Sequence, residues 1–394
     1  MDYRINEDSD KGLIIGLDLK ENSALLSVYD YDNKIIEPVE VDTRQEIYFN
    51  KSFSELIKNN STYVDNDYEE LTSLIRDFIN MCSAKKSIYR IDSICVCLHT
   101  YDEEYLMGIK TAFDNLGIDS GKWQIISKVE SFAYYAYSQK KELYLGGVCL
   151  LDFGKIGLNV YRLISKRSNN IDYIIEEHQL FDSPDFKDVI CKKKTLDDCD
   201  EQLCAALNSF LNKRAVSTIY ITGPGFCTDT LPQAFTKLIV SRRKAFMGQN
   251  LYTRGACYCA LENICPNVFD NTVLLSEQRI MVGIELDILE QGKPKRFRLI
   301  RPGTNWFMAD RCVDFIIEDM QQINLKILTA DNRFDDEIID ISDFPYREGK
   351  TTRISIEVKF YSATRCQIVV KDLGFGDFFK SSGKVIYKDL DFAI

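Results

Sequence analysis

The alternation of apolar and polar residues divides the first part of the chain into strands and helices. Three extended apolar segments occur within residues 12–41, and Glu21-Asn22 and Asp32-Asn33 mark turns between them. Further along, apolar side chains recur at spacings of three and four, which predicts an amphipathic helix; they are Leu71, Leu74, Ile75, Phe78, Ile79 and Cys82. Strands and helices then alternate up to residue 140, as expected of an α/β lobe.

A second lobe is predicted over residues 141–270, because the same alternation returns. It begins with the apolar strand GVCLLDF, which is followed by two extended runs, LNVYRLI and IDYIIEEHQL. A helix over 196–213, a strand VSTIYITG and a helix around 249–264 complete it. The sequence thus predicts two α/β lobes, residues 12–140 and 141–270, after a flexible polar N-terminus at residues 1–11.

The pattern changes after Pro266. Residues 278–394 contain short strands with alternating apolar and polar positions, separated by turn signals and without a long helical period. This pattern predicts an all-β module, a sandwich of two sheets. The segment 271–277 is predicted to be the linker between the second lobe and this module.

Charge and hydropathy limit the class of partner and the compartment. The formal net charge is −11, so a nucleic-acid partner would need a local basic patch. Two basic runs, Lys192-Lys193-Lys194 and Arg242-Arg243-Lys244, are interpreted as solvated surface, since neither joins a broader basic stripe. No apolar stretch is long enough for a membrane helix, and the N-terminus lacks the apolar core of a secretory signal. We therefore expect a cytoplasmic protein that binds neither nucleic acid nor membrane.

The 13 cysteines are expected to be reduced, and most of them buried. Many lie within apolar runs, and the chain shows no secretory signal. Two C-x-C pairs, Cys95/Cys97 and Cys257/Cys259, raise the question of a metal site. Neither pair has a second ligand pair at zinc spacing, and the chain has only two histidines, so buried thiols are the preferred interpretation.

Acidic residues at the ends of two apolar strands are the first candidates for a functional site. Asp18 and Asp152 each lie in a strand–turn–strand hairpin, in IIGLDLKENSALLSVYD and LLDFGKIGLNVYRL. A Gly-rich turn, TGPG at 222–225, ends another strand, and small residues recur in TRGACYCA at 253–260. Two facing acidic hairpins suit a nucleoside triphosphate, because turn amides hold phosphate oxygens and carboxylates hold Mg²⁺ mainly through water. Taken singly, each aspartate is more often a turn or cap residue.

The order of these motifs resembles the actin, sugar-kinase and heat-shock ATPase superfamily. The stretch from SICVCLHTYDEE to WQIISKVESFAYYAY is similar in order and length to the seventy-kilodalton (DnaK-type) heat-shock chaperones. The strands from LLSEQRIMVGIELDI to RCQIVVKD resemble the substrate-binding β-sandwich of these chaperones, and NTVLL resembles their interdomain linker. The resemblance implies a two-lobed actin-like ATPase fold with ribonuclease H-like lobes, followed by a chaperone-like β-sandwich without a helical lid.

The same resemblance implies a set of site residues and two cofactors, ATP and Mg²⁺. Asp18 and Asp152 take the metal positions of the two hairpins, and Asp152 is also a catalytic candidate. Glu130 takes the acidic position that orients the attacking water, through the E-x-x-A pattern of ESFA; a helix-start role is the alternative from the residues themselves. The expected nucleotide contacts are Asp18, Lys20, Gly154, Gly157, Gly223 and Gly225.

Both hairpins depart from the superfamily pattern. Lys20, Glu21 and Asn22 stand where glycine and hydroxyl residues are expected. Lys20 is suited to contact phosphate, whereas Glu21 would repel it if its side chain pointed inward. In the second hairpin Lys155 and Ile156 come before Gly157, and their side chains crowd the backbone where phosphate is expected.

Two functions follow as hypotheses. The first is a divergent heat-shock-chaperone-like protein that binds ATP between its lobes, with weak ATPase activity as an open question, and binds protein or extended peptide through its sandwich. The alternative is a nucleotide-free pseudo-ATPase that acts as a scaffold or adaptor in protein assembly. A sugar or acid kinase ranks last, because no sugar-binding constellation is recognised.

Overall fold

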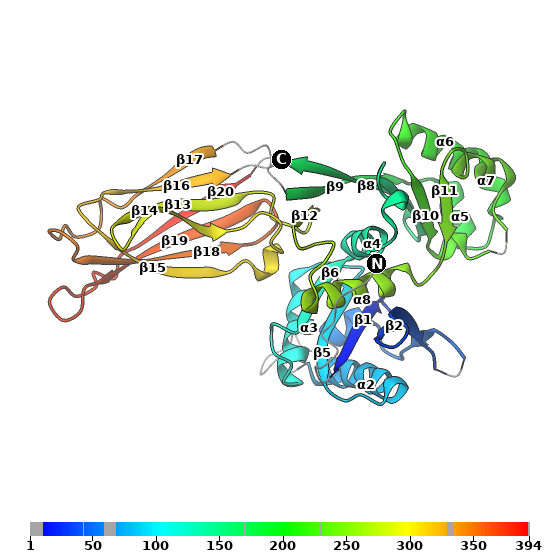
Figure 1. Cartoon of the computed structure of the whole chain (residues 1–394), viewed down its shortest axis with the longest axis horizontal. Coiled ribbons are helices and arrows are strands. Elements are labelled where there is room, and N and C mark those ends of the chain that lie inside the picture. The colour runs from blue at the N-terminus through cyan, green and yellow to red at the C-terminus, as the bar shows by residue number, and fades with distance from the viewer. Residues whose placement is uncertain are drawn as a thin grey trace. The chain divides into compact units, whose positions relative to one another are not determined.

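The structure is a computed structural model that describes residues 11–41, 43–58, 68–168, 171–228, 230–328 and 334–392. All but the last residue of the predicted flexible N-terminus, 1–11, lies outside the described residues. The chain divides into two compact units, Met1–Thr272 and Val273–Ile394 (Figure 1). Among the described residues, the first unit contains both helices and sheets, and the second is built from β-strands. The boundary between them falls within the segment 271–277 and within strand β12 (Thr272–Leu275).

The first sheet of unit 1 has the strand order β3-β2-β1-β5-β6, with β4 paired to β2. Strands β1 to β3 form an antiparallel meander, and β5 and β6 continue the sheet in parallel with β1. The strands are β1 Leu13–Leu19, β2 Ser23–Asp30, β3 Ile35–Val39, β4 Glu46–Tyr48, β5 Ile91–Leu98 and β6 Trp123–Ser127. The helices in this part of the chain are α1 Phe53–Lys58, α2 Glu69–Lys86, α3 Glu103–Asn115 and α4 Lys128–Tyr137.

The second sheet of unit 1 contains the order β11-β10-β7-β8-β9. Here too the first three strands, β7 to β9, are an antiparallel meander, and β10 and β11 follow in parallel with β7. The strands are β7 Val148–Gly154, β8 Gly157–Ser168, β9 Ile171–Phe181, β10 Thr218–Thr222 and β11 Lys244–Met247. The helices are α5 Pro184–Ile190, α6 Asp200–Leu211, α7 Gln233–Ile239 and α8 Leu251–Ile264, with short 3-10 turns at Lys141–Leu143, Asp197–Cys199 and Pro224–Phe226.

The two sheets therefore repeat one topology, in which the first strand of each meander is the central strand. Both central strands, β1 and β7, are apolar and buried along almost their whole length, as is typical of strands covered on both faces. One helix belongs to one predicted lobe by its sequence position and packs on the sheet of the other. Helix α8 lies in the sequence range of the second lobe, but it packs on β1 of the first sheet, where Gly16 meets Thr253 and Cys257.

Unit 2 consists of two four-stranded antiparallel sheets that lie face to face (Figure 1). Their orders are β14-β13-β16-β17 and β15-β18-β19-β20. Alternate residues are buried along β18 and β19, because one face of each strand contributes to the core. The strands are β13 Gly283–Glu290, β14 Lys293–Ile300, β15 Arg311–Ile317, β16 Gln322–Leu328, β17 Phe334–Asp340, β18 Thr352–Phe360, β19 Arg365–Gly374 and β20 Val385–Asp391, with a 3-10 turn at Trp306–Met308.

Two predictions from composition can be compared with the fold. None of the helices in the described part of the chain has the length and apolar character needed to cross a membrane. The thiols of both C-x-C pairs are buried, as expected. Burial also raises the pKa of Cys149 to about 12, as expected for a thiol that packs as an apolar group.

Candidate functional site

Asp18 lies near the end of β1, just before the turn into β2. Its side chain is fully buried, and its Oδ1 lies 2.7 Å from Nε2 of His99. His99 directly follows β5, the parallel neighbour of β1 in which Cys97 pairs with Asp18. Because parallel strands end at the same edge of a sheet, the fold brings these two side chains together. Oδ2 of Asp18 is buried and has no hydrogen-bond partner among the described residues, so a water or ligand would be favoured there.

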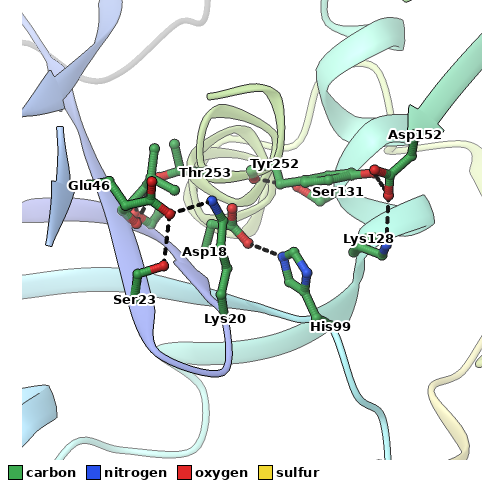
Figure 2. A network of polar contacts seen from close by, with 12 residues as sticks. Asp18, Lys20, Ser23, Glu46, His99, Lys128, Ser131, Asp152, Tyr252 and Thr253 are labelled. Atoms are coloured by element: carbon green, nitrogen blue, oxygen red, sulfur yellow. Dashed lines mark hydrogen bonds and ion pairs between the residues drawn. The ribbon is translucent and has the colours of Figure 1, made fainter. Parts of the chain in front are cut away.

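Lys20, which was expected to contact phosphate, is paired with Glu46 of β4. Its Nζ donates to Oε1 of Glu46 at 2.8 Å, and the hydroxyl of Ser23 donates to the same oxygen at 2.7 Å (Figure 2). Burial opposes ionisation of Glu46, but the hydrogen bonds from Lys20 and Ser23 outweigh it and hold the pKa below its ordinary value. Glu21 accepts a hydrogen bond from the amide of Ser54 at 3.1 Å. Both charged side chains of the first hairpin thus have partners within the protein.

Asp152 lies near the end of β7 and is also buried. Its Oδ2 accepts hydrogen bonds from Nζ of Lys128 at 2.6 Å and from the hydroxyl of Tyr252 at 2.8 Å. Lys128 begins α4, and Tyr252 lies in the first turn of α8. Burial lowers the pKa of Lys128, but the adjacent Asp152 raises it more, so the ammonium is favoured. Burial, and then Asp152, raise the pKa of Tyr252 well above its ordinary value, so the phenol stays a donor.

Tyr252 joins the two carboxylates into one network. Its ring stands edge-on to the ring of His99, with centroids 5.7 Å apart, while its hydroxyl binds Asp152. Nζ of Lys128 lies 5.8 Å from the centroid of the Tyr252 ring. Figure 2 shows the resulting series of side chains, from Asp18 through His99 and Tyr252 to Asp152 and Lys128. We call these five residues the paired-aspartate network.

Glu130 makes the contacts of a helix-start residue. It is fully buried and forms a capping box with Ser127: its Oε2 accepts from the amide of Ser127 at 2.8 Å, and its own amide donates to the Ser127 hydroxyl at 3.3 Å. These bonds satisfy the free amides at the start of α4 and fit the structural alternative that the sequence offered. Its role as a catalytic acid stays a prediction.

The glycines of the 222–225 turn are needed for packing against β7. Gly223 has φ +100°, and a Cβ there would lie 2.7 Å from Oδ1 of Asp152 and 2.6 Å from the carbonyl oxygen of Phe153. A Cβ on Gly225 would lie 2.3 Å from the ring of Phe153. The backbone of Gly223 also exchanges two 3.2 Å hydrogen bonds with the amide side chain of Gln249. The absence of side chains at Gly223 and Gly225 therefore makes room for Asp152 and Phe153 of β7.

The second hairpin turns tightly between Gly154 and Gly157, which pair across β7 and β8. Gly157 has φ +138°, and a Cβ would lie 2.4 Å from the carbonyl oxygen of Phe181. A Cβ on Gly154 would meet open space. The intervening Lys155 and Ile156 are exposed, and their crowding of a bound phosphate stays a prediction.

Helix α8 holds the network in place through very close packing. A Cβ on Gly255 would lie 1.9 Å from the carbonyl oxygen of Ser131 on α4. The hydroxyl of Thr253 lies 3.1 Å from the carbonyl oxygen of Gly16 and 3.2 Å from that of Leu25. The hydroxyl of Ser131 donates to the carbonyl oxygen of Tyr252 at 2.5 Å. Small side chains thus let α8 approach both β1 and α4 and fix the position of Tyr252.

Mg-ATP fits these residues poorly. Lys128 and Tyr252 already bind Oδ2 of Asp152, and a lysine ammonium repels a second cation. The space that a side chain at Gly223 would occupy is filled by Phe153 and Asp152. The buried Oδ2 of Asp18 has no hydrogen-bond partner among the described residues, and the space beside Gly154 is open.

Sequence reasoning identified the two aspartates but missed the side chains that bind them. His99 and Lys128 each directly follow a parallel strand, β5 and β6, and that position was a usable signal. For Tyr252 the sequence offered no comparable signal, since its place depends on α8 returning to the first sheet.

Two family models match successive parts of the chain. Residues 39–277 match the model described as "Family of unknown function (DUF5716) C-terminal", and residues 279–392 match "Domain of unknown function (DUF8552)". No curated protein matches the chain. Because the first of these models spans more than half of the 394 residues, the chain belongs to the family of unknown function DUF5716.

Proposed function

We propose that this chain is a nucleotide-independent scaffold: a pseudo-ATPase with an actin-like two-lobed core, whose β-sandwich binds protein. The repeated topology of unit 1 supports the core assignment. Each sheet has an antiparallel meander of three strands followed by two parallel strands, which is the arrangement expected of duplicated ribonuclease H-like lobes. The two face-to-face antiparallel sheets of unit 2 support a chaperone-like sandwich.

The observation that carries the proposal is the ion pair between Lys128 and Asp152. In a working site a carboxylate at this position would hold Mg²⁺ through water, and it would have to be available to the metal. Here a lysine ammonium at 2.6 Å and a phenol at 2.8 Å share the same carboxylate oxygen. The protein thus supplies its own cation where a nucleotide-dependent relative would recruit a metal ion.

The second candidate is an ATP-binding, chaperone-like protein with weak ATPase activity. It is favoured by the unsatisfied Oδ2 of Asp18 and by the open space beside Gly154. In this case Lys128 would have to leave Asp152 when Mg²⁺ binds. The two candidates therefore differ in what Mg-ATP does to the full-length protein.

We expect Mg-ATP to leave the stability of unit 1 unchanged. A ligand at about 100 times its Kd would stabilise the native state by about 2.7 kcal/mol, which a calorimetric unfolding scan detects easily. Titration calorimetry of the full-length chain should give no saturable heat with Mg-ATP, Mg-ADP or Mg²⁺ alone. Saturable binding that is lost in Asp152→Asn would overturn the scaffold proposal and establish the second candidate.

We also expect Lys128→Met to destabilise unit 1 by about 1–3 kcal/mol, because the buried Asp152 would lose its half-buried counter-ion while keeping the Tyr252 bond. Urea unfolding followed by the fluorescence of the buried Trp123 measures the change, in a Trp306→Phe background. Lys155→Met, an exposed lysine of the second hairpin, is the matched control and should change stability by less than about 0.5 kcal/mol. Equal stability of both variants would mean that Lys128 is free to leave Asp152.

A further inference from the structure

The connection between β19 and β20 carries an exposed aromatic segment. It is the red loop at one end of the sandwich in Figure 1, and we call residues 375–380, with the sequence FGDFFK, the aromatic knob. Phe378 is 93 % exposed, and the other two rings, Phe375 and Phe379, are 38 % and 39 % exposed. Within the described part of the chain no large apolar side chain is more exposed than Phe378. Three phenylalanines thus lie within five residues, and the almost fully exposed ring of Phe378 is the part of this segment that is best placed to meet a partner.

The base of the aromatic knob is held by a buried ion pair. Both terminal nitrogens of Arg347 donate to the carboxylate of Asp372 at 2.8 Å, and one of them also donates to the carbonyl oxygen of Lys380 at 3.1 Å. The carboxylate further accepts from the amides of Gly374 at 3.0 Å and Ser382 at 2.8 Å. Both ends of the connection are therefore tied to one buried charge.

The aromatic knob itself is closed by its backbone. The amide of Phe375 donates to the carbonyl oxygen of Phe379 at 2.6 Å. Gly374 turns the chain with φ +69°, and a Cβ there would lie 2.2 Å from the same oxygen of Phe379. The rings are thus presented on a fixed loop, which reduces the entropy lost on binding. An exposed ring held in this way is suited to insertion into a pocket, and a loop that only connected two strands would not need it.

The charge of the aromatic knob distinguishes between possible partners. The aromatic knob carries one charge of each sign, with Asp377 between the rings and Lys380 at its end, and both side chains are exposed. Asp377 directly precedes Phe378, and it forms no ion pair within the residues that the structure describes. Placing its carboxylate in a lipid bilayer would be unfavourable, which argues against membrane insertion. A protein pocket with a basic rim would bind both the ring and the carboxylate. The net charge of −11 would also steer the chain toward a basic surface.

We propose that the aromatic knob docks into an apolar pocket on a protein partner, with Phe378 inside the pocket and Asp377 on a lysine or arginine at its rim. The proposal rests on the proposed function only in the expectation that the sandwich binds protein. It does not depend on the paired-aspartate network. A positive Mg-ATP titration would overturn the scaffold proposal and leave the aromatic knob untouched.

The first test is site-specific photo-cross-linking of the full-length chain in cells. Phe378→p-benzoylphenylalanine should cross-link to one protein, and mass spectrometry of the cross-linked peptide should place the link in an apolar pocket beside lysine or arginine. Tyr361→p-benzoylphenylalanine is the matched control, since Tyr361 is 51 % exposed at the β18–β19 connection of the same sheet. Failure of Phe378 to cross-link above this control would overturn the proposal.

The second test measures the affinity of the identified partner for purified full-length variants. Phe378→Ser should weaken binding by about 30-fold, the change that corresponds to the 2 kcal/mol of a hot-spot residue. Asp377→Lys should weaken it as well, most strongly at low salt, whereas Tyr361→Ser should bind like the unmodified chain. Unchanged unfolding midpoints are expected for all three, because the replaced side chains are exposed.

Two further outcomes would count against a protein partner of this kind. Binding to phosphatidylcholine–phosphatidylserine vesicles that is lost in Phe378→Ser would identify a lipid surface instead. Self-association in sedimentation velocity that is lost in the same variant would identify a second copy of this chain. Either result, like an affinity insensitive to Phe378→Ser and Asp377→Lys, would overturn the proposal.

Discussion

Gly255→Ala is expected to destabilise unit 1 by about 3 kcal/mol or more, at or beyond the upper end of the usual cost of overpacking. The added Cβ would lie 1.9 Å from the carbonyl oxygen of Ser131 and 2.6 Å from its carbonyl carbon, and both atoms belong to the backbone of α4. No rotamer change relieves such a contact, so the two helices must move apart. Urea unfolding followed by Trp123 fluorescence in a Trp306→Phe background measures the loss.

The matched control is Gly108→Ala, which also replaces a buried glycine within a helix of unit 1. Its Cβ would lie 2.4 Å from Cδ1 of Ile57, the far end of a flexible side chain that can turn aside. Alanine also favours the helix over glycine by about 1 kcal/mol, which offsets part of the cost. We expect the Gly108 variant to be far more stable than the Gly255 variant. Similar losses in both would show that the α4–α8 contact is not especially tight.

Displacement of α8 also bears on the paired-aspartate network. Tyr252 and Gly255 lie one turn apart on this helix, so we expect a shift that relieves the contact with Ser131 to disturb the hydrogen bond from the phenol to Asp152. Tyr252→Phe removes the hydroxyl without changing the helix packing, and it separates the two effects. The network is thus a product of the helix packing as much as of its own charges.

Periodicity alone was sufficient to predict most of the elements. The three-four spacing from Leu71 to Cys82 predicted α2, and the apolar run GVCLLDF predicted β7. Alternation predicted the strands of unit 2. The destination of α8 was not predicted, because periodicity reports which face of a helix is apolar and not which sheet it covers. The close approach of Gly16 to Cys257, and the contacts of Thr253 with the carbonyl oxygens of Gly16 and Leu25, show that this helix packs on the first sheet.

The sequence allowed the acidic residues of the candidate site to be predicted, but not the side chains that bind them. Strand ends placed Asp18 and Asp152 correctly in buried hairpins. Glu130 illustrates how two local patterns compete: ESFA matched a family motif, while the spacing of Ser127 and Glu130 is that of a capping box. The observed hydrogen bonds are those of the capping box. Local physical chemistry accounts for this residue without any catalytic role.

Arg347→Met is expected to destabilise unit 2 by about 3–5 kcal/mol, the usual cost of leaving a buried charge without its partner. Both side chains are almost fully buried, and Arg347 supplies two of the hydrogen bonds that the Asp372 carboxylate accepts. Because Trp306 is the one tryptophan of unit 2 in the sequence and is buried, its fluorescence in a Trp123→Phe background follows the unfolding of this unit. Arg353→Met, an exposed arginine of β18, is the matched control and should cost less than about 0.5 kcal/mol.

The pH dependence gives this prediction a second, independent readout. Burial opposes ionisation of Asp372, but the hydrogen bonds from Arg347 and Ser382 outweigh it and hold its pKa well below the ordinary value. A depressed carboxyl pKa contributes stability that is complete above the unfolded-state value of about 3.9 and is lost as the pH falls below it. The advantage of the unmodified chain over Arg347→Met/Asp372→Leu should therefore shrink below about pH 4. The double variant should also recover part of the loss of Arg347→Met, since no uncompensated charge remains buried. If the single variant were as stable as the double, the ion pair would not be what holds the base of the aromatic knob.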